Sequence, residues 1–155
     1  MKRILLVDDD GLVRRGAHRL LERAGYEVWE TASAKVALDL LDRMPIDMVI
    51  TDIYMPGMNG ITLIREIGRR PNRARLIAMT GGGYRTPGDL LEEAAGAGAE
   101  RTLAKPFTAD LLLGLVADLL QPPRGAGVGG AVHAVAAQPR HERGFDPAAA
   151  DMAWH

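Results

Sequence analysis

Five short apolar runs, separated by longer amphipathic segments, constrain the fold of this chain more than any other feature of its sequence. We expect each run to be a buried strand and each following segment to be a helix, because apolar residues in those segments recur at helical spacing. A regular alternation of strand and helix is typical of an α/β protein with a doubly wound sheet. The expected strands are residues 4–7, 26–30, 48–51, 76–79 and 101–104.

The expected helices have recognisable start and stop residues. Polar side chains suited to helix N-caps are Asp10, Ser33, Asn59, Thr86 and Thr108. Glycines suited to helix ends are Gly25, Gly96 and Gly98. In the first helix, residues 11–24, we expect Leu12, Val13, Ala17, Leu20, Leu21 and Ala24 to face inward. The strand at 26–30 alternates apolar with acidic residues, which predicts an edge position with one exposed face.

Composition and charge exclude several functional classes. The chain has 155 residues and no cysteine, so disulfides, thiolate metal sites and cysteine nucleophiles are ruled out. The formal net charge of −1 shows no basic excess of the kind that nucleic-acid-binding domains carry. The first apolar run is four residues long, too short for a signal peptide or a membrane span. We therefore expect a cytoplasmic protein with no direct nucleic-acid contact and no membrane contact.

The last 35 residues differ in composition from the first 120. Residues 121–155 contain nine Ala, five Gly and four Pro, which is 18 of the 35, and few large aliphatic side chains. Such a segment cannot bury enough apolar surface to offset the entropy lost on ordering. We expect a folded domain at 1–120 and a disordered tail at 121–155, in which Phe145 and Trp154 are the candidates for docking a partner.

Polar side chains stand where four of the apolar runs stop. Asp8 and Asp9 follow the first run, Asp52 the third, Thr80 the fourth and Lys105 the fifth. The carboxyl ends of parallel strands lie along one edge of an open sheet, where ligands bind. We expect three carboxylates, a hydroxyl and an amine to converge there, although a single strand-end aspartate is often only a turn former.

The three carboxylates would suit a divalent cation. Acids that lie close together repel one another unless a cation or a proton compensates. Mg²⁺ prefers oxygen ligands and uses one or two carboxylates together with substrate phosphate. Asp8, Asp9 and Asp52 can supply that chemistry, with Mn²⁺ as an alternative ion.

The same cluster would suit phosphoryl transfer. The carboxylate of Asp52 can attack phosphorus to form an acyl phosphate. Phosphoryl transfer depends mainly on positioning and on charge stabilisation. Lys105 offers a compact cation to one phosphoryl oxygen, Thr80 a hydroxyl donor to another, and Gly81 an N–H that no side chain obstructs.

Four stretches of the chain form a recognisable set: Leu6-Val7-Asp8-Asp9, Thr51-Asp52-Ile53-Tyr54-Met55-Pro56-Gly57-Met58-Asn59-Gly60, Ala78-Met79-Thr80-Gly81 and Ala104-Lys105-Pro106-Phe107. With these stretches, residues 1–120 resemble the response-regulator receiver domain of two-component signalling. The resemblance covers about three quarters of the chain. It implies a flavodoxin-like (βα)5 fold with five parallel strands in the order 2-1-3-4-5, and a stand-alone regulator of the chemotaxis type or a phosphorelay intermediate.

The resemblance also implies roles for single residues. Asp52 would accept a phosphoryl group from a histidine kinase or a histidine phosphotransfer protein. Asp9 and Asp52 would bind Mg²⁺ directly, Asp8 through water and Tyr54 through its backbone carbonyl. Lys105 would contact the phosphoryl group. The protein would be a signalling phospho-acceptor, not an enzyme on other substrates, and would catalyse its own phosphotransfer and dephosphorylation.

Switching would follow from phosphorylation, which adds about −1.5 to −2 charges. The resemblance implies that Thr80 moves toward the phosphoryl group, that Thr102 occupies the second switch position, and that the Lys105–Pro106 peptide is cis. Output would be binding of a downstream protein, through the surface formed by the helix that begins near Thr86, the strand 101–104 and the helix that ends at Leu120. A homodimer could use the same surface.

Two features depart from the family pattern. Three residues before Lys105 the family usually has Tyr or Phe, whereas this chain has Thr102, which cannot fill a pocket the size of a ring. Gly81, Gly82 and Gly83 follow Thr80, and glycine loses the most entropy on ordering. Gly82 also leaves no side chain near the attacking water, which predicts an altered dephosphorylation rate.

Alternative functions remain open from the sequence. A flavodoxin-like cofactor-binding protein would hold a flavin phosphate with residues 81–83 and Tyr84, and a constitutive binding module would keep the fold without switching. A nucleotide hydrolase lacks its Gly-x-x-x-x-Gly-Lys loop. On the first helix, Arg14, Arg15, Arg19 and Arg23 form a basic stripe next to His18, which we interpret as a solvated face, with docking of an acidic partner as the alternative.

Overall fold

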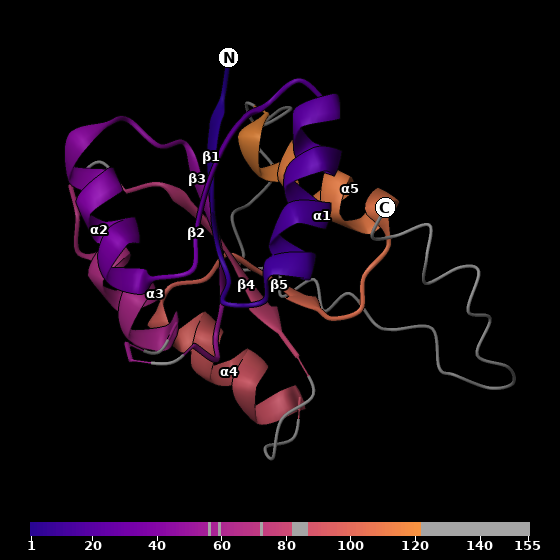
Figure 1. Ribbon diagram of the computed structural model, residues 1–155. Coiled ribbons are helices and arrows are strands. Elements are labelled where there is room, and N and C mark those ends of the chain that lie inside the picture. Colours follow the sequence, from indigo (N-terminus) through magenta and orange to yellow (C-terminus); the bar gives the residue numbers. More distant parts are fainter. Residues whose placement is uncertain (56, 59, 72, 82–86, 122–155) are drawn as a thin grey trace, which may run out of the picture.

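Five parallel strands form one sheet at the centre of the domain (Figure 1). The computed structural model describes residues 1–55, 57–58, 60–71, 73–81 and 87–121. The strand order is β2-β1-β3-β4-β5, which confirms the predicted flavodoxin-like, doubly wound fold and places β2 at a sheet edge. The strands are β1 (Arg3–Val7), β2 (Glu27–Thr31), β3 (Met48–Asp52), β4 (Arg75–Thr80) and β5 (Arg101–Ala104).

Helices cover both faces of this sheet (Figure 1). Helices α2, α3 and α4 lie on one side, and α1 and α5 lie on the other. Their bounds are α1 (Gly11–Arg23), α2 (Ala34–Arg43), α3 (Gly60–Gly68), α4 (Pro87–Ala97) and α5 (Ala109–Leu120). Each helix connects two strands or follows the last one, as the alternation of apolar runs and amphipathic segments predicts.

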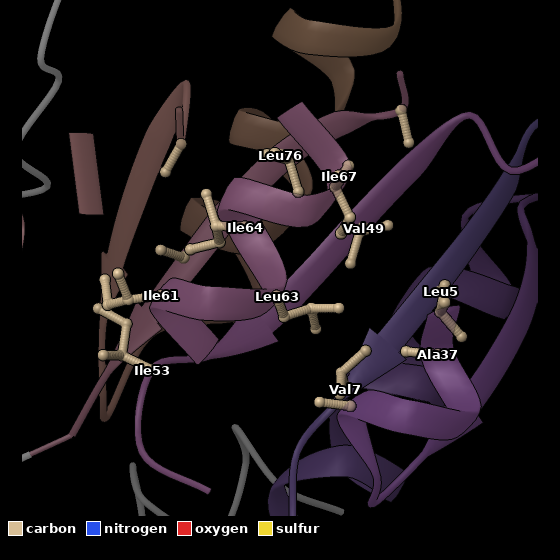
Figure 2. Close-up of a cluster of buried hydrophobic side chains, with 14 of the residues drawn as sticks. Leu5, Val7, Ala37, Val49, Ile53, Ile61, Leu63, Ile64, Ile67 and Leu76 are labelled. Atoms are coloured by element: carbon tan, nitrogen blue, oxygen red, sulfur yellow. The ribbon is translucent and has the colours of Figure 1, made fainter. Parts of the chain in front are cut away.

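Side chains of the central strands alternate between two hydrophobic clusters. In β1, Leu5 and Val7 belong to the cluster under α2, α3 and α4, whereas Ile4 and Leu6 belong to the cluster under α1 and α5. The strands are therefore apolar on both faces, as expected for a parallel sheet that is covered on both sides. Figure 2 shows the first cluster, in which the α3 residues Ile61, Leu63, Ile64 and Ile67 pack inward as predicted.

Three of the predicted helix caps are confirmed. The side chains of Asp10, Ser33 and Thr108 accept hydrogen bonds from backbone N–H groups in the first turns of α1, α2 and α5. The predicted caps Asn59 and Thr86 lie outside the described residues. Gly25 and Gly98 have φ angles of +96° and +122°, which glycine adopts without strain, so these two residues end α1 and α4.

A few local predictions were wrong. Gly96 lies inside α4 and does not end it. Leu12 is 72% exposed, and Ala24 is exposed as well, so the buried stripe of α1 is narrower than the sequence suggested. Strands β1, β2, β3 and β4 differ from their predicted ranges by one residue at one or both ends, since hydropathy does not mark where ladder pairing stops.

The structure also bears on the expectations about membranes and the tail. Among the described residues, no helix combines the length and the apolar character needed to cross a membrane. The expected tail falls almost entirely on residues 122–155, which are outside the described part of the chain. The predicted disorder of the tail therefore stays a prediction.

Candidate functional site

The predicted site residues lie at the carboxyl ends of four adjacent strands. Strands β1 and β3 pair in parallel register up to Val7 and Thr51, so the next residues, Asp8 and Asp52, lie side by side where these two strands end. Strand β4 continues the same edge, since Asp52 is opposite Met79. Thr80 is in turn opposite Ala104 of β5, next to Lys105.

Three carboxylates meet at this edge. Oxygen atoms of Asp8, Asp9 and Asp52 all lie within 4.8 Å of one another. Asp8 and Asp52 are buried, with 0% and 6% of their surface exposed, whereas Asp9 is exposed. Burial in a medium less polar than water strengthens the repulsion between the carboxylates, so the cluster requires positive charge.

Lys105 supplies part of that charge. Its Nζ atom lies 2.7 Å from Oδ2 of Asp8 and 2.9 Å from Oδ2 of Asp52, with 15% of the lysine side chain exposed. Burial by itself would lower the pKa of Lys105, but the hydrogen bonds to Asp8 and Asp52 outweigh it and raise the pKa above its usual value of 10.5. The lysine is therefore held in its charged form between two acids.

The ionised form of Asp8 remains unfavourable even though Lys105 donates a hydrogen bond to it. Burial raises the pKa of Asp8 above its usual value of 3.8, although hydrogen bonds from Lys105 and from the backbone N–H of Asp10 lower it in part. Repulsion from Asp52 adds to the increase. In ionised form the three carboxylates face one ammonium group from Lys105, which leaves two negative charges at the cluster. Oxygen ligands with this charge fit a divalent cation of the Mg²⁺ type.

The β3–α3 connection places Asp52 by close backbone packing. The N–H of Tyr54 donates to Oδ1 of Asp52 at 3.1 Å, and the N–H of Gly60 donates to the backbone oxygen of Ile53 at 2.9 Å. A Cβ atom on Gly60 would lie 2.0 Å from the backbone oxygen of Asp52. Only glycine can therefore occupy position 60 in this arrangement, which brings the start of α3 against the end of β3.

The remaining described site residues lie on β4, on β5 and in the connections that follow these strands. Thr80 is buried at the end of β4, and a Cβ atom on Gly81 would lie 3.8 Å from Cδ of Lys105. Thr102 is buried on β5, and by alternation with Leu103, which faces α5, its side chain faces the α4 side of the sheet. The Lys105–Pro106 peptide is cis, as expected. Gly82, Gly83 and Tyr84 lie outside the described residues.

One contact near the site was not predicted from the sequence. Arg14 was interpreted as part of a solvated stripe, but its side chain is only 17% exposed and its Nη1 atom donates to the backbone oxygen of Asp8 at 2.6 Å. Its Nε atom lies 3.5 Å from Oε1 of Glu30 on β2, and the other oxygen of Glu30 lies 2.8 Å from Nδ1 of His18. The side chain of His18, interpreted as part of the same solvated face, is 27% exposed and is in contact with Glu30. Glu30, an acidic residue on the edge strand β2, was the feature of the sequence from which a partner for Arg14 could have been predicted.

Comparison with known proteins identifies the family of the domain. The sequence model described as "Response regulator receiver domain" matches residues 4–117. The chemotaxis protein CheY of Thermotoga maritima is 36% identical over 107 residues, which are 68% of this chain and 87% of that protein. Sporulation initiation phosphotransferase F of Bacillus subtilis is 31% identical over 109 residues, which are 70% of this chain and 86% of that protein.

Solved structures agree with this assignment. The response regulator TrrA of Thermotoga maritima, in complex with Mg²⁺-BeF, superposes with a TM-score of 0.68 at 33% identity, covering 77% of this chain and 100% of that one. The chemotaxis response regulator CheY4 of Vibrio cholerae superposes with a TM-score of 0.70 at 27% identity, covering 77% and 99% of the two chains. Taken with the acidic cluster at the sheet edge, these matches show that the chain belongs to the response regulator receiver domain family, whose members are signalling phospho-acceptors of two-component systems.

Proposed function

We propose that Asp52 is the phospho-acceptor of this receiver domain and that it takes a phosphoryl group from a phosphohistidine on a histidine kinase or a histidine phosphotransfer protein. The observation that carries the proposal is the position of Lys105, whose ammonium group touches the carboxylates of Asp8 and Asp52 at once. A cation that contacts the nucleophile and a second acid can stabilise negative charge that develops beside the nucleophile. Asp52 is also the last residue of β3, the central strand of the sheet, which lies between β1 and β4.

Each side chain has a separate part in the proposed transfer. A carboxylate oxygen of Asp52 forms the new bond to phosphorus while the bond from phosphorus to the donor nitrogen breaks. Lys105 neutralises one phosphoryl oxygen, and the hydroxyl of Thr80 and the N–H of Gly81 are the proposed donors to the others. Because phosphoryl transfer depends chiefly on position and charge, these contacts need no further acid or base at the acceptor.

The acidic cluster is the proposed site for Mg²⁺, with Mn²⁺ as a substitute. Asp8, Asp9 and Asp52 fit the ion by charge and by ligand type, and the backbone carbonyl of Tyr54 is the fourth proposed ligand. A bound divalent cation would offset the negative charge of the carboxylates and of the incoming phosphoryl group. The TrrA structure, which holds Mg²⁺, supports the choice of ion.

A labelling experiment tests this proposal. The protein is incubated with a small phospho-donor and MgCl₂, and its intact mass is measured. We expect wild type to gain the mass of one phosphoryl group, Asp52→Ala to gain none, and labelling to stop when the divalent cation is chelated. Asp39→Ala, which changes an exposed aspartate on α2, is the matched control and should label like wild type. Undiminished labelling of Asp52→Ala would contradict the assignment.

Output is proposed to occur through the α4-β5-α5 face, with Thr80 and Thr102 at the two switch positions. The phosphoryl group would give Thr80 and Lys105 a new partner and shift the population between two states. Thr102 is buried but much smaller than the aromatic side chain usual in the family, so we expect weak coupling to this face. Amide hydrogen exchange before and after phosphorylation tests the coupling, because a coupled face would change the protection of its amides.

A homodimer through the same face is a further part of the proposal. Sedimentation of the phosphorylated protein would reveal it.

A further inference from the structure

We propose that Arg14 is a positioning residue that fixes the peptide plane between Asp8 and Asp9 and so sets the affinity of the acidic cluster for Mg²⁺. The inference rests on the metal site of the proposed function. Helix α1 and the edge strand β2, which supply no ligand, would thereby take part in metal binding.

Arg14 reaches the peptide unit between the two proposed ligands of the β1–α1 connection. Nη1 of Arg14 donates to the backbone oxygen of Asp8 at 2.6 Å. That carbonyl belongs to the peptide unit that joins Asp8 to Asp9, the two proposed ligands on the β1–α1 connection. A peptide unit is planar, so rotation of this unit would swing the Asp9 side of the connection relative to Asp8. A donor on the carbonyl oxygen restricts that rotation.

The other polar groups of Asp8 already have partners. Its backbone N–H donates to the backbone oxygen of Thr31 at 3.2 Å, its Oδ1 accepts from the N–H of Asp10 at 2.9 Å, and its Oδ2 accepts from Lys105 at 2.7 Å. The contact with Arg14 completes this set at the carbonyl oxygen. Asp8 is thereby held by its own connection and by residues of β2, α1 and the segment after β5, while the exposed Asp9 depends on the peptide unit that precedes it.

The edge strand in turn holds Arg14. Oε1 of Glu30 lies 3.5 Å from Nε of Arg14, and Oε2 of Glu30 lies 2.8 Å from Nδ1 of His18. Nε of Arg14 is buried and makes no hydrogen bond within the described part of the chain, so Glu30 attracts the guanidinium by charge. The arginine side chain is largely buried, and these contacts favour the one orientation that reaches Asp8.

The proposal predicts an effect opposite in sign to that of simple electrostatics. A guanidinium repels a nearby cation, so removal of its charge alone should tighten Mg²⁺ binding. If Arg14 positions the two ligands, its removal should weaken binding, because partners that orient metal ligands commonly contribute about 10- to 100-fold in metal affinity. The direction of the change therefore separates the two effects.

The experiment is a calorimetric titration of the full chain with MgCl₂, without a phospho-donor. For Arg14→Gln we expect a dissociation constant about tenfold higher than for wild type, at the low end of the range for such contacts. Arg19→Gln removes the same charge from an exposed position on the same helix and should leave the constant within about twofold of wild type. An unchanged or lower constant for Arg14→Gln would overturn the proposal, as would an equal rise in both variants.

A second variant covers a failure to fold. Thermal unfolding curves recorded without metal show at which temperatures every variant is folded, and the titrations are done at one of these temperatures. If Arg14→Gln does not fold, Arg14→Lys decides, because it keeps the charge and loses the fork that spans Asp8 and Glu30. Severalfold weaker binding by Arg14→Lys supports the proposal, and binding equal to wild type overturns it. If wild type itself binds no Mg²⁺, the metal site of the proposed function fails, which is a separate result.

Discussion

The charge balance of the acidic cluster is the main feature at the scale of single residues. Lys105 is held charged by two acids, yet burial still raises the pKa of Asp8. The folded protein therefore binds the Asp8 proton more tightly than the unfolded chain does. Where the folded state binds more protons than the unfolded state, the free energy of unfolding falls as the pH rises. Without a bound cation, the ionised carboxylate of Asp8 should destabilise the fold at neutral pH.

Substitution of Asp8 tests this balance. In the absence of divalent cations at pH 7, we expect Asp8→Asn to unfold at a higher temperature than wild type, because the amide removes the buried charge. The difference should shrink as the pH falls through the raised pKa of Asp8, which lies above 3.8, since wild type then becomes neutral at this position. Thermal unfolding followed by circular dichroism at several pH values measures it.

MgCl₂ provides the matching control for that series. Added Mg²⁺ should stabilise wild type and should stabilise Asp8→Asn less, because a ligand stabilises only the state that binds it. A wild type that is more stable than Asp8→Asn at pH 7 without metal would show that the hydrogen bonds of Asp8 outweigh the cost of its buried charge.

Much of the candidate site could be predicted from single residues because it depends on strand ends. Hydrophobic runs show where buried strands stop, and parallel strands stop at one edge, so Asp8, Asp9 and Asp52 could be placed together. The contact of Arg14 with Asp8 could not be predicted in the same way. A helical arginine next to other arginines has the pattern of a solvated surface, and its true orientation depends on how α1 lies against β2.

At the scale of elements, the junction of β3 and α3 controls where Asp52 stands. The N–H of Gly60 donates to Ile53, and the Cα of Gly60 approaches the backbone of Asp52 more closely than any side chain would permit. The obstructing atoms are backbone atoms, which cannot move aside like the end of a flexible side chain. The start of α3 and the end of β3 must therefore adjust together if position 60 changes.

Gly60→Ala should consequently be strongly destabilising. We expect a loss of about 3 kcal/mol or more in the free energy of unfolding, at the upper end of the cost of overpacking, measured by urea denaturation. Gly114→Ala is the matched control, because a Cβ atom at this exposed position in α5 would meet nothing within 4 Å. It should stabilise the protein by about 0.5–1 kcal/mol. A loss below about 1 kcal/mol for Gly60→Ala would mean that the junction relaxes easily.

The elements themselves were predictable because both of their patterns are strong. Continuous apolar runs mark strands that are covered on both faces, and helical spacing marks the helices between them, so all ten predicted elements are present. The predictions of buried residues were wrong where the hydrophobic spacing of a helix extends beyond the part of it that packs on the sheet. Leu12 has the spacing of a buried residue but stands on the first turn of α1, beyond the edge of the core.

At the scale of the whole molecule, both hydrophobic clusters come almost entirely from the region that the family model matches, and only Leu119 and Leu120 lie beyond it. Their described members lie between Ile4 and Leu120, and the match covers residues 4–117. The sheet separates the two clusters, and the acidic site stands at the sheet edge between them. Removal of the residues beyond Gln121 should therefore leave the core and the site intact.

A chain that ends at Gln121 tests this view of the molecule. We expect its thermal unfolding midpoint and its Mg²⁺-dependent labelling to equal those of the full chain, because the tail composition gives little apolar surface to bury. A clear fall in the midpoint would show that residues 122–155 contribute to the fold, contrary to the expectation of a disordered tail.

The identity of the phosphorylated residue in the whole protein decides whether Asp52 is the phospho-acceptor. Borohydride reduces an aspartyl phosphate to homoserine, so peptide mapping of the reduced, phosphorylated chain reads the modified position. We expect homoserine at position 52 and at no other aspartate. Homoserine at Asp8 or Asp9, or a phosphoryl group found on a hydroxyl or a histidine instead, would contradict this expectation.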